Sequence, residues 1–303
     1  MPELPDLALY VDAIRARLHG ARLNGVRIAS PSLLRTVDPP WNAPVGRALR
    51  AVELVGKRLV LAFDDDLFAA LHLMIAGRLR YGPPGAAVPA KVGLAAFDFD
   101  RGALTLVEAS PKKRAALHVL RGRAAVDALD AGGVDPLGPA APFVAALRRE
   151  NRTLKRALTD PRLVAAVGNA YSDEILHRAR LSPLRRTGDC DDATLLRLHA
   201  AAVDTLTFWI GRLREETGDA WPTKVTAFRK GMAVHGRFGL PCPDCGAAVQ
   251  RITYAEKNDC NYCPTCQTEG RLLADRSLSK LMRDDWPRTL EELEERMRDL
   301  KAR

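Results

Sequence analysis

Residues 49–74 read LRAVELVGKRLVLAFDDDLFAALHLM, and this stretch indicates the fold of the first part of the chain. Its short apolar segments, and two further segments like them, are separated by turn residues such as Asp64-Asp65-Asp66 and Asp100-Arg101-Gly102. The segments lie at 49–55, 58–63, 67–74, 92–97 and 103–107. Short apolar runs bounded by turn residues are typical of β-strands. We therefore expect a β-rich N-terminal domain, a sandwich.

A helix is expected in front of these strands and several more behind them. Leu7, Val11, Ile14 and Leu18 share one face of a helix over 5–19, which Gly20 is suited to end. Glycine and proline at 132–139 suggest a linker. After the linker, helical spacing covers 142–150, 152–159, 161–167, 170–178 and 191–215. A last helix is expected from about 288, with Thr289 and Glu292 as its capping box and Leu290, Leu293, Met297 and Leu300 as its apolar stripe.

The expected fold class is α+β. The expected domains are a β-sandwich over 1–131, a helical domain over 132–225, a cysteine-rich segment over 226–283 and a C-terminal helix over 284–303.

The composition suits a polyanionic partner. Among 303 residues, 46 are Lys or Arg and 37 are Asp or Glu, which gives a formal charge of +9. Aromatic residues are only 6% of the chain, which argues against a broad surface for base stacking. The first residues are charged and amphipathic, and no apolar run approaches the length of a membrane span. We expect a cytoplasmic monomer without membrane contact.

Cysteine spacing predicts a metal site, because five of the six cysteines fall between Cys242 and Cys266. Cys242-Pro-Asp-Cys245 and Cys263-Pro-Thr-Cys266 are two C-x2-C pairs, typical of one structural zinc ion held by four thiolates on a β-hairpin. Cys260 also forms a C-x2-C pair with Cys263. The Cys-Pro-x-Cys form occurs twice, which favours Cys263 and Cys266 as ligands and leaves Cys260 as a spare thiol.

The chain begins Met1-Pro2-Glu3, which offers a nucleophile. Removal of Met1 would leave Pro2 as a secondary amine, and an α-amino group has a pKa of roughly 8, so part of it is uncharged near neutral pH. Attack on a carbonyl-like carbon would give an iminium, and Glu3 is placed to move protons. Taken alone, the same residues also fit an ordinary chain terminus.

The chain resembles the formamidopyrimidine-DNA glycosylase/endonuclease VIII family over nearly its whole length. The resemblance rests on several short motifs that occur in the family's order. These are Pro2-Glu3-Leu4-Pro5, Gly56-Lys57-Arg58-Leu59, His72-Leu73-Met74-Ile75-Ala76-Gly77, Asp135-Pro136-Leu137, the stretch VGNAYSDE at 167–174, Val234-His235-Gly236-Arg237 and the cysteine pairs.

The resemblance implies a β-sandwich, a helix–two-turn–helix domain and a zinc finger that bind duplex DNA containing a damaged base or an abasic (AP) site. It implies that Pro2 attacks C1′ and displaces the base, that β- and δ-elimination follow, and that Glu3 transfers protons. Lys57 would bind phosphate and support elimination, and Asn169 would hold the phosphate beside the lesion. Met74 would fill the space that a flipped nucleotide leaves; without the resemblance, core packing at the end of a strand is the favoured explanation of Met74.

Three departures from the family pattern concern the substrate. Ser110-Pro111-Lys112-Lys113-Arg114-Ala115 replaces a stretch with an intercalating arginine and phenylalanine; Lys112, Lys113 and Arg114 can still bind phosphate, but lysine lacks the planar fork of arginine. The finger lacks the family's arginine, so its phosphate contact falls to Lys257 or Asn258. The segment 220–232 is short for a lid over 8-oxoguanine.

Oxidised purines and pyrimidines therefore all remain candidate substrates. Two other readings stay open: a non-catalytic DNA-binding protein on the same fold, and a zinc-ribbon module that binds RNA.

Overall fold

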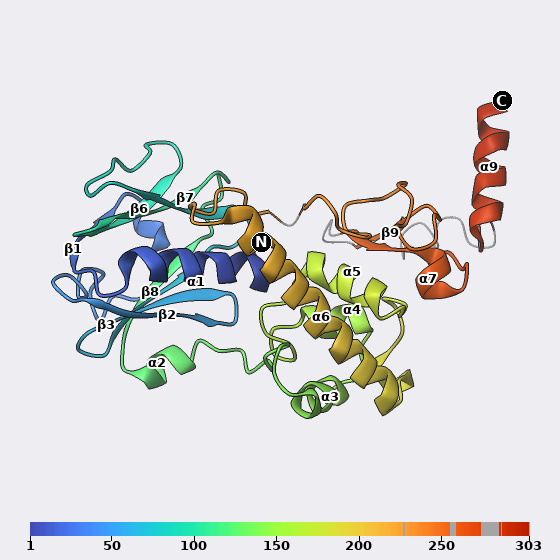
Figure 1. Ribbon diagram of the computed structural model, residues 1–303, viewed down its shortest axis with the longest axis horizontal. Coiled ribbons are helices and arrows are strands. Elements are labelled where there is room, and N and C mark those ends of the chain that lie inside the picture. The colour runs from blue at the N-terminus through green and yellow to red at the C-terminus, as the bar shows by residue number, and fades with distance from the viewer. Residues whose placement is uncertain (227, 255–258, 274–284, 286, 303) are drawn as a thin grey trace. The chain divides into compact units, whose positions relative to one another are not determined.

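The chain forms two compact units in the computed structural model, which describes residues 1–226, 228–254, 259–273, 285 and 287–302 (Figure 1). The first unit comprises Met1–Gly132 with Thr207–Ala227, and the second comprises Gly133–Leu206 with Phe228–Arg303. The expected domain limits stay predictions. Within the described residues, no helix combines the length and the apolar character that crossing a membrane requires.

The first unit is built on two four-stranded antiparallel sheets, with strand orders β1-β6-β7-β5 and β2-β3-β4-β8. The strands are β1 (Leu23–Ile28), β2 (Leu49–Val55), β3 (Arg58–Phe63), β4 (Leu67–His72), β5 (Gly77–Gly82), β6 (Gly93–Phe99), β7 (Gly102–Glu108) and β8 (Ala116–Arg121). A short helix α2 (Arg123–Asp127) and a 3-10 turn at Pro31–Leu33 complete its loops. The expected N-terminal β-sandwich is confirmed.

One apolar core joins the two sheets and the leading helix α1 (Leu4–Leu18). Phe63 of β3 stacks on Phe99 of β6 with ring centroids 6.3 Å apart. The face predicted for α1, which carries Leu7, Val11, Ile14 and Leu18, is buried in this core. The helix ends before Gly20, whose φ of +76° lies in the left-handed region that glycine favours.

Three strands, β1, β5 and β8, were not expected from the sequence. Strand β5 reads GRLRYG, and Leu79 is its one fully buried aliphatic side chain between half-buried Arg78 and exposed Arg80. Such a short stretch contains too few apolar residues to stand out as a strand. Pairing with β7 along its full length supplies the stabilisation that its composition does not predict.

The segment that follows the longest helix packs with the sandwich. Helix α6 (Asp192–Thr217) begins in the second unit and ends in the first. Trp221 then donates its Nε1–H to Leu79 O at 2.9 Å and lies beside Tyr10 and Tyr81, with centroids 5.8 and 5.6 Å away. Val225 is buried in the same core.

The second unit contains most of the described helices and a two-stranded hairpin. Its helices are α3 (Ala140–Arg148), α4 (Leu154–Thr159), α5 (Asn169–Arg178), the first part of α6, α7 (Pro264–Thr268) and α9 (Leu290–Ala302), with a 3-10 turn at Thr187–Asp189. Strands β9 (Gln250–Thr253) and β10 (Asp259–Tyr262) pair antiparallel. The α+β class is confirmed.

The helix expected over 161–167 is wrong. Val134 N–H donates to Leu163 O at 3.0 Å, and Ala165 N–H donates to Val134 O at 2.9 Å, so this backbone pairs with the linker where a helix would form its own ladder. Ala166 has a φ of +57°, which a helix excludes. The apolar residues of this stretch are buried as an irregular loop between α4 and α5.

The expected C-terminal helix is present as α9. Glu292 N–H donates to Thr289 Oγ1 at 3.3 Å, and Arg288 N–H donates to Glu292 Oε2 at 2.7 Å. The side chains of Met297 and Leu300, half of the expected apolar stripe, lie outside the described residues.

Candidate active site and metal centre

The register of the β2-β3-β4-β8 sheet gathers most of the predicted site residues of the first unit at one end. Arg58 pairs with His72, and His72 pairs with Ala116. The turn before Arg58, the loop after His72 and the loop before Ala116 therefore leave the sheet at the same edge. The predicted residues on these turns and loops are Lys57, Met74, Lys112, Lys113 and Arg114.

The start of α1 is buried. Pro2 is buried, and Glu3 has only 3% of its surface exposed. Glu3 is the N-cap residue of the helix, and its backbone N–H donates to Asp6 Oδ2 at 3.2 Å. Asp6 thus fixes the backbone beside Glu3.

The amine at the chain start and Lys57 share one electrostatic environment. Burial lowers the pKa of the Met1 α-amino group, an effect that Glu3 opposes and that Arg78 and Lys57 increase. Burial likewise lowers the pKa of Lys57, and the charge of Glu3 partly offsets this. Both amines are therefore held closer to the uncharged, nucleophilic form than they would be in water.

His72 is a polar group at this edge to which the sequence motif alone gave no role. Its Nδ1 accepts the Met74 N–H at 3.1 Å. Burial and the nearby cations Arg58 and Lys57 lower its pKa to about 4. His72 is thus neutral at pH 7, with its proton on Nε2, and can donate one hydrogen bond there. Only the pairing of strands reveals that it lies beside Lys57.

The β4–β5 loop exposes Ile75 and not Met74. Met74 is half-buried with a φ of +52°, whereas Ile75 has 64% of its surface exposed. The loop is tight, because Gly77 N–H donates to Leu73 O at 2.8 Å. A Cβ on Gly77 would lie 2.2 Å from that oxygen, so the turn requires glycine. The exposed apolar side chain of this loop is therefore Ile75.

The three cations before β8 do not point the same way. Lys113 has a φ of +43°, and its Nζ donates to Glu108 O at 2.5 Å and Lys91 O at 3.3 Å. Its ammonium group is thus bound to the protein backbone. Lys112 and Arg114 are exposed. Two of the three predicted phosphate contacts on this loop face solvent.

Asn169, predicted to hold phosphate, begins α5 in the second unit. Its Nδ2 donates to Asp259 O of β10 at 2.8 Å. Its own carbonyl accepts from Lys155 Nζ at 2.7 Å. The residue therefore links α4, α5 and the hairpin.

A buried ionic cluster lies beneath Asn169. Asp173 Oδ1 accepts from Lys155 Nζ at 2.6 Å, and Asp173 Oδ2 lies 2.7 Å from His235 Nδ1. Burial alone would raise the pKa of Asp173, but Lys155 and His235 hold it below its ordinary value. Sequence reasoning missed this cluster, because Lys155 appears there as one basic residue on a helix.

Glu174 holds the backbone segment 233–235, which precedes the first cysteine pair. Its carboxylate accepts the backbone N–H groups of Ala233, Val234 and His235 at 2.7, 2.9 and 2.9 Å. Burial raises its pKa, while these three bonds oppose that rise. The two acids in the stretch VGNAYSDE at 167–174 thus bind different groups: Asp173 lies beside the ring of His235, and Glu174 accepts the His235 backbone N–H.

The four predicted metal ligands come together. The sulfurs of Cys242, Cys245, Cys263 and Cys266 lie within 4.8 Å of one another. Cys242 and Cys266 are 3.9 Å apart, and Cys245 and Cys263 are 3.3 Å apart. A tetrahedron with Zn–S bonds of about 2.3 Å separates its sulfurs by roughly 3.8 Å. Four thiols at such spacing fit a zinc ion, and Cys260 is packed instead with Ile252 and Tyr262.

Two predicted DNA contacts, Lys257 and Asn258, lie outside the described residues. The segment 220–232 is described except for residue 227, and Trp221 and Val225 fold its first part onto the sandwich. These contacts leave little chain to serve as the lid that the sequence already predicted to be short.

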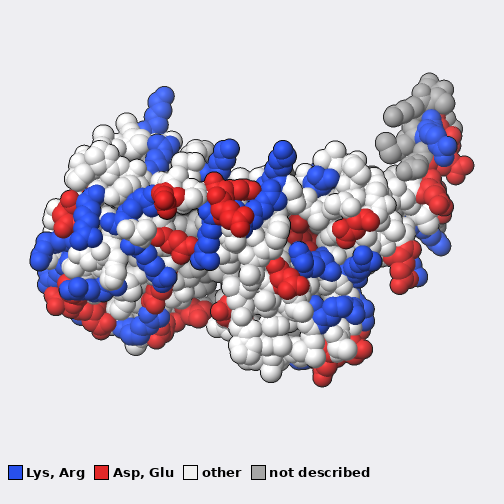
Figure 2. Space-filling view, viewed as in Figure 1, with Lys and Arg blue, Asp and Glu red and all other residues white. Residues whose placement is uncertain are grey.

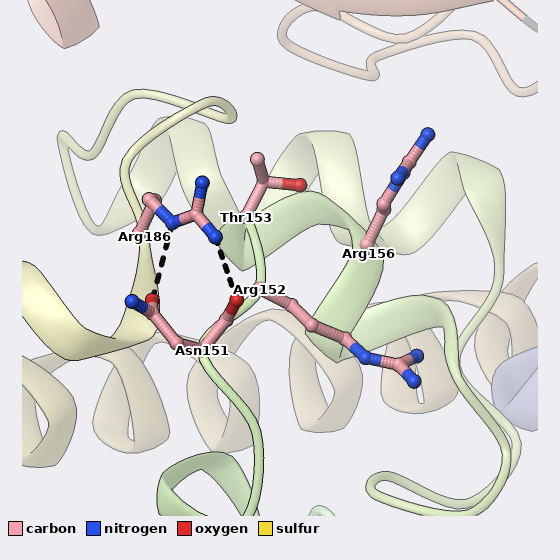
Figure 3. Close-up of a pocket in the computed structure, with 5 residues that line it drawn as sticks. All are labelled: Asn151, Arg152, Thr153, Arg156 and Arg186. Atoms are coloured by element: carbon pink, nitrogen blue, oxygen red, sulfur yellow. Dashed lines mark hydrogen bonds between the residues drawn. The ribbon is translucent and has the colours of Figure 1, made fainter.

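A hollow of about 410 Å³ lies elsewhere on the second unit (Figure 3). It is lined by Asn151, Arg152, Thr153, Arg156 and Arg186. Asn151 holds Arg186 through its Oδ1 and backbone O at 3.3 and 3.0 Å, while Arg152 and Arg156 point in different directions (Figure 3). These guanidinium groups supply positive charge without converging on one ligand.

Charge on the visible face of the molecule is mixed. Lys and Arg side chains lie among Asp and Glu side chains (Figure 2). On that face the net charge of +9 is not collected into a single patch.

Comparison with known proteins identifies the family. Residues 1–117 match the formamidopyrimidine-DNA glycosylase N-terminal domain, and residues 133–216 match the H2TH (helix–two-turn–helix) domain of the same enzymes. A formamidopyrimidine-DNA glycosylase of Roseiflexus is 33% identical over 281 residues, covering 88% of this chain and all of the relative. An uncharacterized formamidopyrimidine-DNA glycosylase-like protein of Mycobacterium tuberculosis is 42% identical over 130 residues, 43% of this chain and 80% of the relative.

Solved structures agree on the fold. A Lactococcus lactis Fpg in complex with DNA containing an abasic site has a TM-score of 0.78 at 23% identity, covering 88% of this chain and 99% of that one. A MutM structure with DNA containing carbocyclic 8-oxoguanine has a TM-score of 0.76 at 22% identity, covering 88% and 100%. The chain belongs to the formamidopyrimidine-DNA glycosylase family of DNA repair proteins.

Proposed function

We propose that this protein is a DNA glycosylase with AP-lyase activity that removes oxidised bases from duplex DNA. The observation that carries the proposal is the buried start of α1, where Pro2 and Glu3 share an electrostatic environment with Lys57. The surroundings that lower the pKa of the Met1 amine would act in the same way on a Pro2 amine freed by removal of Met1. A larger uncharged fraction favours nucleophilic attack.

The reaction follows from this amine. The Pro2 nitrogen forms a bond to C1′ as the bond from C1′ to the base breaks, and the sugar ring opens to an iminium. Loss of a proton from C2′ then expels the 3′ phosphate, and a second elimination expels the 5′ phosphate. Glu3, the N-cap residue of α1 and the neighbour of Pro2, transfers protons to the opening sugar and from the amine.

DNA would be held through phosphates at the sheet edge of the first unit and at the start of α5 in the second. Lys57, His72, Lys112 and Arg114 offer donors or charge in the first unit, and Asn169 does so in the second. The Lactococcus lactis relative is bound to abasic-site DNA, which supports this class of partner. The wedge that we assign to the β4–β5 loop is Ile75 in preference to Met74, because Ile75 is the exposed side chain.

A zinc ion held by Cys242, Cys245, Cys263 and Cys266 would be structural. Four thiolates complete a tetrahedral shell, so such an ion stabilises the fold without binding water or substrate. A hairpin with strands as short as Gln250–Thr253 and Asp259–Tyr262 buries too little apolar surface to fold alone.

Borohydride trapping on a duplex with one AP site tests the proposal. Intact mass first establishes that Met1 is absent. We expect a covalent adduct with the wild type, and loss of most of that adduct with Pro2→Gly while DNA binding persists. Tight binding without any adduct would favour the non-catalytic alternative, for which the altered stretch 110–115 is the supporting feature.

A further inference from the structure

His177 is a buried polar side chain that the proposed reaction does not use. It lies in the last turn of α5 with 4% of its surface exposed. Its Nε2 is 3.3 Å from Cys242 Sγ. This distance is within the range of a hydrogen bond to sulfur.

The position of His177 allows two roles beside a metal. Its ring, an Asp244 oxygen and the Cys266 sulfur lie within 4.8 Å of one another, so these three groups could themselves hold an ion. The four cysteine sulfurs, however, already make a complete tetrahedral set. A thiolate bound to zinc accepts hydrogen bonds, and an imidazole N–H is a suitable donor.

Helix α5 is joined to the cysteine-bearing segment along its whole length. Asn169 bonds to Asp259 O in its first turn, Asp173 accepts the Asn261 N–H at 3.1 Å, and Glu174 accepts three backbone N–H groups. His177 is the contact in the last turn, and it reaches a metal ligand directly. The bond therefore connects the helix that begins with Asn169 to the metal centre.

We propose that His177 donates a hydrogen bond from Nε2 to the Cys242 thiolate and thereby retains the metal without binding it. The inference rests on the proposed zinc site. His177 is a positioning residue, since it acts on the metal only through Cys242. Groups that hydrogen-bond to metal ligands typically contribute 10–100-fold in metal affinity.

Two variants of the full-length protein separate the donor from the bulk of the ring. His177→Phe keeps a ring of similar size but has no N–H, and His177→Gln keeps a donor. Zinc affinity is measured by competition with a chromogenic chelator, and the ligand set is read from the absorption of cobalt-substituted protein. We expect about 10–100-fold weaker zinc binding in His177→Phe, substantial recovery in His177→Gln, and a four-sulfur cobalt spectrum in both.

Different results would overturn the idea in distinguishable ways. Unchanged zinc affinity in His177→Phe refutes the role of the hydrogen bond and leaves the zinc site standing. A cobalt spectrum that loses a nitrogen ligand in His177→Phe shows that His177 binds the metal itself. Wild-type protein that binds no zinc refutes both this inference and the proposed metal centre.

A measurement on the wild type covers the case in which His177→Phe does not fold. NMR of zinc-loaded protein with nitrogen-labelled histidine reports which ring nitrogen carries the proton. A proton on Nε2 supports the bond to sulfur, and a proton on Nδ1 alone excludes it.

Discussion

Lys155 Nζ lies 2.6 Å from Asp173 Oδ1, and the two side chains are only 4% and 0% exposed. A buried pair of this kind contributes little compared with an apolar pair, but each partner depends on the other. Removing the lysine would leave a buried carboxylate without the ammonium group that now bonds to its Oδ1. The side chain of the neighbouring Arg156 is exposed and makes no hydrogen bond or ion pair with the described residues, so it provides a matched control.

Lys155→Met is therefore expected to lower the free energy of unfolding by about 3–5 kcal/mol. Arg156→Met should change it by less than about 0.5 kcal/mol. Urea unfolding followed by circular dichroism measures both. Equal effects of the two changes would contradict the account of the cluster.

Ile75→Ala should weaken binding to an AP-site duplex more than Met74→Ala does. Loss of an apolar side chain that becomes buried between bases costs about 1–2 kcal/mol, which is roughly tenfold in affinity. Fluorescence anisotropy on AP-site and undamaged duplexes measures the change, and the undamaged duplex serves as the control. If Met74→Ala has the larger effect, the wedge is Met74, as the sequence motif predicts.

His72 predicts a dependence of stability on pH. Its pKa of about 4 in the folded protein lies below the ordinary value of 6.5, so the unfolded chain binds the proton more readily. The contribution of His72 to stability is complete above pH 6.5 and decreases as the pH falls toward 4. His72→Gln should flatten this part of the urea midpoint profile, and an unchanged profile would contradict the lowered pKa of His72.

We expect Cys245→Ala and Cys260→Ala to differ in zinc content. Cys245→Ala removes one sulfur of the cluster and should abolish stable zinc binding. Cys260→Ala should leave one zinc ion per chain, because Cys260 is packed against Ile252 and Tyr262 and is not one of the four clustered sulfurs. Elemental analysis after dialysis measures both proteins. Loss of zinc from Cys260→Ala would reverse the ligand assignment.

The sequence predicts those parts of the molecule whose signal is local. The strands within 49–74 are short apolar runs bounded by turn residues. The C-x2-C spacing places each pair of ligands together whatever the rest of the chain does. The loop at 161–167 could not be predicted, because its apolar residues have helical spacing while its backbone pairs with distant Val134. The end of β4 was also not predicted correctly. The apolar run extends over 67–74, but the strand ends at His72 and leaves Met74 in the loop.

Some residues of the candidate site could likewise be predicted from the sequence, and others could not. Pro2 and Glu3 are recognisable by chemistry at the chain start. The roles of Lys155, Asp173 and His177 come from burial and from contacts across 18 and 65 positions of sequence, which no local pattern contains.

The hydrogen bonds of Asp173 affect how the second unit unfolds locally. Its Oδ1 accepts a hydrogen bond from Lys155 of α4. Its Oδ2 bonds to the His235 ring and accepts the Asn261 N–H of the hairpin. Local unfolding of any one of these segments would leave the buried Asp173 carboxylate without one of its hydrogen-bond partners. Amide protons throughout α4, α5 and β10 should consequently exchange with solvent as a single cooperative group.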